Sequence, residues 1–216
     1  GMGTLIQQVG NKLRTNGVKI ETNAPVQSVK KNEKGYTVYY VRDGKIVSMV
    51  VDFVVMAVHA DVAAKLVKDD PYFGMATMIL EQLPYFEAHI VIHQDTNYIN
   101  TEKPAFLNIY TNKENQLRFS TMNLSLISPR LNGIYKSWMP EEDTQRVKEK
   151  GLLLHETTFY HPLITPEFVA HLHELKVLSG KLEGICIIGG WTEGLETQNS
   201  AVVSAKRAVE VYKNWK

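Results

Sequence analysis

Two glycines near the C-terminus, Gly189 and Gly190, come directly after the apolar run 185–188. Glycine has no Cβ, so its backbone can approach a flat or charged ligand closely. A helix is predicted to begin near Asn199, and the amides at a helix N-terminus favour negative charge. Together these features predict a site for a ligand that carries or gains negative charge. Taken alone, the glycine pair is equally compatible with a plain turn.

Two stretches in the first third of the chain are further candidates for the ligand site. Pro25-Val26 opens a predicted strand, although a proline often does no more than start one. The stretch 52–58 is nearly all apolar, as in a strand buried on both faces, and Ala57-Val58-His59-Ala60-Asp61 runs across its end. We interpret His59 as a packing or loop residue rather than a catalytic base.

The pattern of apolar residues and turn signals predicts alternating helices and strands. Asp43-Gly44 indicates a hairpin, and Thr165-Pro166 indicates a helix start. Helices are predicted at 4–16, 60–67, 71–83, 165–178 and 199–215, and a loop or short helix at 141–150. Strands are predicted at 18–20, 26–30, 36–41, 45–50, 52–58, 88–93, 105–110, 117–122, 134–138, 152–159 and 185–188.

Composition argues against several classes of partner. The 24 basic and 23 acidic residues nearly balance and form no basic stripe, which predicts no nucleic-acid partner. No apolar run reaches the roughly 18 residues of a membrane span, and the N-terminus has no signal-peptide pattern. The lone cysteine, Cys186, fits a reducing compartment and therefore a cytoplasmic location.

The order of these stretches resembles the flavin-containing amine oxidase and phytoene desaturase group. The likeness rests on the helix start 1–4, the strand start 24–29, the stretch 52–61, and 187–192 followed by 200–205. Bacterial proteins of the predicted NAD/FAD-binding type also share Ala-x-His-Ala-Asp and the run Phe159-Tyr160-His161-Pro162.

The resemblance implies FAD as the cofactor and an amine oxidase-like oxidoreductase. In that case the backbone of Val26 would meet the adenine side, and Ala57 would lie near the same half of the cofactor. Trp191 would pack beside the flavin or line the substrate cavity, unless it is an ordinary half-buried tryptophan. The residues expected along the ribityl chain and flavin ring are Gly189, Gly190, Gln198, Ser200 and Ala201.

The sequence departs from that family in three places. The Gly-x-Gly-x-x-Gly turn that holds the FAD pyrophosphate has no counterpart, so the N-terminal nucleotide-binding domain is expected to be missing from this chain. Gly190 stands where an acidic residue is common, and Ala205 stands where a glycine is common. These changes weaken the expectation of tight FAD binding.

The expected fold class is α/β to α+β. Residues 1–67 and 184–216 would form a partial FAD-binding region with a mixed sheet. Residues 68–183 would form an inserted substrate-side domain, an antiparallel sheet with helices. Candidate aromatic residues for the wall of a cavity for a small-molecule substrate are Tyr110, Phe119 and Trp138, and each could equally be core.

No side chain can be assigned as catalytic acid, base or nucleophile. No metal site is predicted either: His171 and His173 do not share a helix face, and no cysteine or carboxylate completes a set with His89 and His93.

A second hypothesis is a non-catalytic, flavin-free ligand-binding or interaction module. An upstream reading frame encoding the glycine-rich turn would favour the enzyme, whereas a natural start at Met2 would favour the module. Apolar surface exposed where the nucleotide-binding domain would dock predicts self-association.

Overall fold

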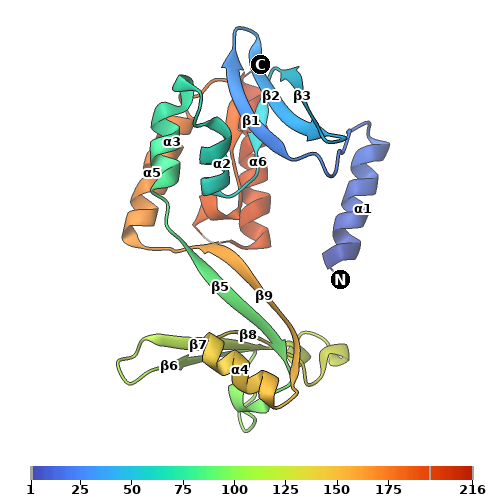
Figure 1. Ribbon diagram of the computed structural model, residues 1–216, viewed down its shortest axis with the longest axis vertical. Helices are drawn as coiled ribbons and strands as arrows, with labels where there is room; N and C mark the ends of the chain where they lie inside the picture. The colour runs from blue at the N-terminus through green and yellow to red at the C-terminus, as the bar shows by residue number, and fades with distance from the viewer. Residues whose placement is uncertain (1, 195, 216) are drawn as a thin grey trace. The chain divides into compact units, whose positions relative to one another are not determined.

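A computed structural model of the protein describes residues 2–194 and 196–215, so Gly1 of the first family stretch lies outside the described residues. Helices mix with parallel and antiparallel strands, which confirms the predicted fold class. The chain divides into two compact units, one of residues 1–84 and 164–216 and the other of residues 85–163, as Figure 1 shows by its colours.

The first unit combines helices, strands and short 3₁₀ turns. Its helices are α1 (Met2–Thr15), α2 (Ala60–Val67), α3 (Gly74–Glu81), α5 (Pro166–Ser179) and α6 (Gln198–Trp215). Its strands are β1 (Val26–Asn32), β2 (Gly35–Arg42), β3 (Lys45–Val51), β4 (Val54–Met56) and β10 (Ile185–Ile187), and its 3₁₀ turns are η1 (Pro71–Phe73) and η5 (Gly190–Glu193). Helix α3 packs against both α2 and α5, so α3 and α5 belong to this unit, although they lie within the sequence range 68–183.

Strands β1, β2 and β3 form an antiparallel sheet in that order. The predicted hairpin is confirmed: Arg42 pairs with Lys45, and Asp43 and Gly44 between them have φ values of 51° and 73°. Two successive positive φ angles are what a tight two-residue hairpin turn requires. The short strand predicted at 18–20 is wrong, because within residues 2–194 and 196–215 this segment pairs with no strand, and Val18 and Ile20 are exposed.

Helix α5 begins as its sequence predicts. Pro166 occupies the first turn, and the Thr165 hydroxyl accepts a hydrogen bond from the Phe168 amide at 3.1 Å. Phe168 is fully buried, so this cap fixes the start of a helix that contributes to the core. The amphipathic pattern of α1 also produces the predicted helix, but its apolar residues Leu5, Ile6, Val9 and Leu13 remain 40–63% exposed.

Strands β4 and β10 pair in parallel as a separate sheet. The prediction that 52–58 is buried on both faces is wrong, because β4 covers only Val54–Met56 and Val55 is 46% exposed. Parallel strands are normally covered on both faces. Here Met56 is buried, whereas no described residue covers the opposite side of β4 well enough to bury Val55.

The second unit is an antiparallel sheet with one helix against it. Its strands are β5 (Tyr85–His93), β6 (Leu107–Thr111), β7 (Leu117–Asn123), β8 (Tyr135–Trp138) and β9 (Leu153–Pro162), in the order β6-β7-β8-β5-β9. The open alternative at 141–150 is resolved as a helix, α4 (Glu141–Glu149). The apolar core of this unit consists of Val91, Tyr98, Phe119, Met139 and Val147.

Candidate functional site

The parallel pairing of β4 and β10 joins two predicted stretches that are distant in sequence. Met56 is the register partner of Ile187, and the Ile188 amide donates to the Met56 carbonyl oxygen at 2.9 Å. The residues that follow the two strands, Ala57 and Gly189, therefore leave the sheet at the same edge. In α/β proteins, ligands bind outside the carboxyl ends of parallel strands.

Gly189 has a backbone conformation that favours glycine, with φ at 150°. A Cβ on this residue would lie 2.6 Å from the indole nitrogen of Trp191. Trp191 itself is buried, with 1% of its surface exposed, and its Nε1 donates to the Val58 carbonyl oxygen at 3.0 Å. The glycine is thus required by the packing of Trp191 over the end of β4.

The N-terminus of α6 brings together the remaining candidates. The Thr197 hydroxyl accepts from the Ser200 amide at 3.1 Å and caps the helix. Ser200 is buried and its hydroxyl lies 2.8 Å from that of Thr197, so this side chain belongs to the cap. Gln198 and Ala201 are exposed on the same turn.

Ser204, one turn further along α6, ties this helix to the glycine turn. Its hydroxyl accepts from the Gly189 amide at 3.3 Å and donates to the Ala201 carbonyl oxygen at 2.9 Å. Sequence reasoning did not assign a role to Ser204, because a serine inside a helix carries no signal for a contact with a distant turn. The structure makes it a positioning residue between Gly189 and Ala201.

A titratable pair borders this edge. His59 Nε2 lies 3.0 Å from the Glu196 carboxylate, and the two side chains are 40% and 20% exposed. His59 is the third residue after β4, whereas Glu196 precedes the cap of α6. Sequence reasoning missed Glu196, since only the fold places it beside His59.

Val26 lies apart from this group in the topology. It opens β1 in the three-stranded sheet, whereas the other candidates follow β4 and β10 or begin α6. Val26 is 40% exposed, so its backbone is accessible from solvent. Its expected role toward the adenine side stays a prediction, as do the roles of the other candidates.

The second unit separates its three aromatic candidates. Phe119 stacks on Tyr110 with ring centres 4.4 Å apart, and both belong to the apolar core. Trp138 lies on the opposite face, because neighbouring strand residues alternate and its neighbour Ser137 faces the core. Trp138 packs against His161 and Phe86, with ring centres 5.0 Å and 6.4 Å apart.

A buried chain of polar side chains crosses the core face of this sheet. His93 Nε2 lies 2.7 Å from the Ser137 hydroxyl, which lies 2.7 Å from that of Thr121. The Asp95 amide donates to His93 Nδ1 at 3.1 Å, and burial lowers the pKa of His93 to about 4. The neutral ring therefore carries its proton on Nε2 and donates to Ser137. Because Nε2 is protonated, His93 cannot act as a base toward Ser137.

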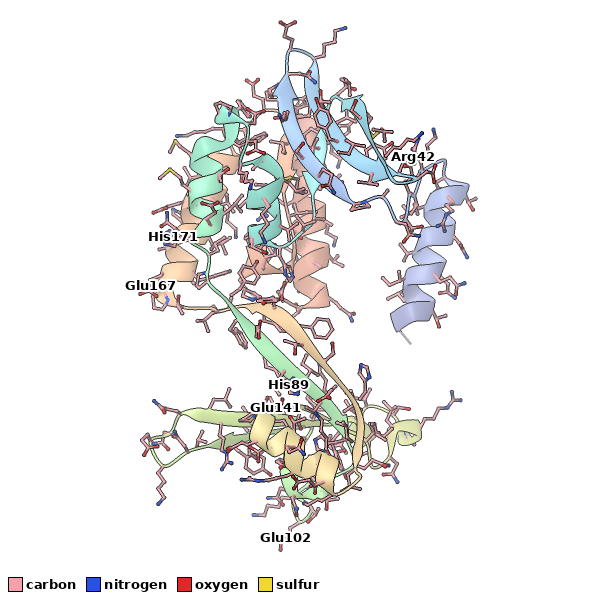
Figure 2. The ribbon with its side chains drawn as sticks, viewed as in Figure 1. Arg42, His89, Glu102, Glu141, Glu167 and His171 are labelled. Atoms are coloured by element: carbon pink, nitrogen blue, oxygen red, sulfur yellow. The ribbon has the colours of Figure 1, made fainter. Side chains whose placement is uncertain are left out.

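His89 and Glu141 point toward one another in Figure 2, from β5 and the start of α4. His89 Nε2 lies 3.7 Å from Glu141 and 3.5 Å from Glu156, whose other carboxylate oxygen meets Lys148 at 2.9 Å. Lys148 also lies 3.8 Å from Glu141, so the four side chains form an ion-pair network between α4 and the sheet. In the described parts of the chain, no group of three or more histidine, cysteine or acidic residues is arranged to hold a metal ion. No helix within residues 2–194 and 196–215 is long and apolar enough to cross a membrane.

The mixed architecture, with parallel β4 and β10 before the capped helix α6, is an α/β fold similar to that of a solved oxidoreductase. Residues 1–91 match the family of flavin containing amine oxidoreductases. This match over residues 1–91 bears out the family resemblance that the order of the motifs predicts. No curated protein sequence matches the chain.

The solved structures that are similar to this chain include two enzymes. An oxidoreductase from Methanosarcina mazei has a TM-score of 0.56 at 11% identity, over 97% of this chain and 54% of that one. A CLA-producing fatty acid isomerase from P. acnes has a TM-score of 0.49 at 11% identity, over 78% of this chain and 43% of that one. The chain therefore spans about half the length of these proteins.

Proposed function

We propose that this chain is part of an FAD-dependent oxidoreductase of the amine oxidase type. The observation that carries the proposal is the parallel pairing of β4 with β10, which sets Ala57 and Gly189 at one edge. The family match over residues 1–91 includes β4 and supports a flavin as the cofactor. A bound FAD would supply the redox chemistry, accepting a hydride from a C–H bond next to nitrogen or from a C–C bond being desaturated.

The residues at this edge fit such a cofactor. Gln198 and Ala201 are exposed on the first turn of α6, where backbone amides and the helix dipole favour negative charge. Gly189 and Gly190 expose backbone without side chains, and Ser204 holds this turn against α6. Trp191 would pack against the buried side of this turn, since its indole is buried. We assign no catalytic acid, base or nucleophile.

An unpaired strand edge and exposed apolar residues in the first unit support a docking partner. Within the described residues β4 pairs only with β10, which leaves its other edge open, and the apolar residues of α1 are exposed. An N-terminal nucleotide-binding domain would cover such surface. Without it, we expect self-association, and a monomeric elution volume in sizing chromatography would contradict this expectation.

We propose that the sheet face opposite α4 contacts the small-molecule substrate. Trp138, Phe86 and His161 form an aromatic cluster there, and the buried Trp138 Nε1 has no hydrogen-bond partner in the described structure. An acceptor on a substrate would satisfy this donor. The single cysteine supports a reducing, cytoplasmic location.

The test is the visible absorbance of the purified chain after incubation with FAD and desalting. Retained flavin absorbance is the expected result for a site completed by this chain or by two copies. Replacing exposed Ala201 by tryptophan should abolish retention, whereas Val209→Trp, also exposed on α6, should not. Equal retention by both variants would contradict a site at the start of α6.

A second candidate function is a flavin-free binding or interaction module. The observation that favours it is the contact between Gly189 and Trp191, which explains the glycine without any ligand. A colourless chain that remains colourless when the upstream nucleotide-binding sequence is supplied would favour the module. Flavin retention only in the presence of that sequence would favour the enzyme.

A further inference from the structure

A cavity of about 460 Å³ lies in the first unit between α5, β10 and α6. Its size falls within the roughly 300–1,000 Å³ typical of small-molecule sites. Residues from the last turns of α6, Val211, Asn214 and Trp215, and the segment before β10 line it. Most of the lining therefore lies toward the start of β10 and the end of α6, while Thr192 and Arg207 extend it toward the glycine turn, and no residue at the start of α6 takes part.

The walls of this cavity are mainly apolar. Leu172 and Leu175 contribute from α5, Cys186 and Ile187 from β10, and Val211 from α6. Leu175, Cys186 and Ile187 are buried, so this part of the wall belongs to the apolar core of the unit. Such a wall suits the apolar body of a ligand.

Cations gather in the lining of the cavity. Arg207 is held in place by Glu193 at 2.6 Å and by the Thr192 hydroxyl at 3.0 Å. Lys176 lies 3.8 Å from Glu193, beyond hydrogen-bond distance, and Lys181 has no ion pair with any described residue. Two ammonium groups are therefore available to a ligand. With Glu183 in the wall and Glu193 beside it, three cations face two carboxylates.

We propose that this cavity binds an amphipathic monocarboxylate, with the carboxylate at Lys176 and Lys181 and the apolar body against Leu175 and Ile187. A neutral ligand would leave the excess positive charge without a counterion, and a cation would be repelled. The apolar wall in turn disfavours a small, fully hydrated anion such as inorganic phosphate. This site is separate from the proposed flavin function and does not depend on it.

Cys186 provides a reporter inside the cavity because it is the only cysteine in the chain. Burial raises the pKa of its thiol, so its reaction with a thiol reagent is measured at mildly alkaline pH. Octanoate should slow labelling of Cys186 in a saturable manner, and octanol and octylamine of the same chain length should protect less. No protection by octanoate, or equal protection by all three, would overturn the proposal.

Substitutions locate the binding site. The double variant Lys176→Gln/Lys181→Gln should weaken octanoate binding, each lost contact by about fivefold. Lys206→Gln removes an exposed cation from α6 outside the lining and should leave binding unchanged. Val211→Trp should block binding by filling the cavity, with circular dichroism showing that the variant is folded. Unchanged octanoate affinity in both the double variant and folded Val211→Trp would place the ligand elsewhere.

Discussion

Trp191 donates the hydrogen of its indole nitrogen to the carbonyl oxygen of Val58, at 3.0 Å. The bond joins η5, which follows β10, to the loop that follows β4; the indole is buried and the bond itself is partly buried. Two segments more than a hundred residues apart are thereby held together at the edge where the cofactor is proposed to bind. A tryptophan that packs there is a structural support for the site.

Trp191→Phe should therefore destabilise the protein. The variant keeps an aromatic ring but leaves the Val58 carbonyl without its donor, which costs about 1–3 kcal/mol for a buried group. Urea unfolding followed by circular dichroism measures the change. Trp215→Phe serves as the control, because Trp215 is 39% exposed near the end of α6, and its effect should be small. Equal losses in the two variants would argue against the hydrogen bond as the cause.

Gly189→Ala should destabilise the protein through the same indole. The added Cβ would meet Trp191 Nε1 at 2.6 Å, and a φ of 150° is itself unfavourable for alanine. Gly74→Ala is the matched control, since a Cβ at Gly74 has no atom within 4 Å and its φ is −51°. That control should be neutral or stabilising by about 0.5–1 kcal/mol. In a Trp191→Leu background, the cost of Gly189→Ala should fall if the clash with the indole dominates.

His93 should make stability depend on pH in the acid range. Its pKa falls from 6.5 to about 4 because the ring is buried, so the unfolded chain takes up a proton that the folded state refuses. The contribution of His93 to the free energy of unfolding is complete above pH 6.5. It declines as pH falls toward 4, by about 3 kcal/mol in all. Denaturant midpoints measured from pH 7 to 4 follow this change. His93→Gln should reduce the slope, whereas exposed His173→Gln should keep it.

Asp143 should contribute more to stability than its neighbour Glu142. Its carboxylate, 3% exposed, accepts from Tyr98 at 3.2 Å, Arg118 at 3.3 Å and Arg146 at 3.0 Å. Asp143→Ala leaves the buried Tyr98 hydroxyl without this acceptor and should cost about 1–3 kcal/mol. Glu142→Ala removes an exposed carboxylate paired with the same Arg118 and should cost less than about 1 kcal/mol. The two unfolding free energies, measured side by side at neutral pH, decide between a buried and a surface role.

The amino-acid sequence by itself determined several local elements and the family resemblance. Asp43-Gly44 produced the expected hairpin because its two positive φ angles suit these residue types. Thr165-Pro166 started α5 because a hydroxyl cap and a proline act within one turn. The order of the motifs indicated a resemblance to the flavin-containing amine oxidoreductases, and the model of that family matches residues 1–91. Each of these signals lies within a short stretch of chain, so no distant residue is needed to interpret it.

Only the tertiary structure decided which of these residues are buried and which meet. The apolar stretch 52–58 predicts a strand covered on both faces, yet Val55 is 46% exposed. Phe119 and Trp138 look alike as cavity candidates, yet one lies in the core under α4 and the other on the opposite face. Burial and contact depend on segments that are distant in the chain, as Trp191 and Val58 are, and the residue pattern of one segment carries no information about its neighbours in space.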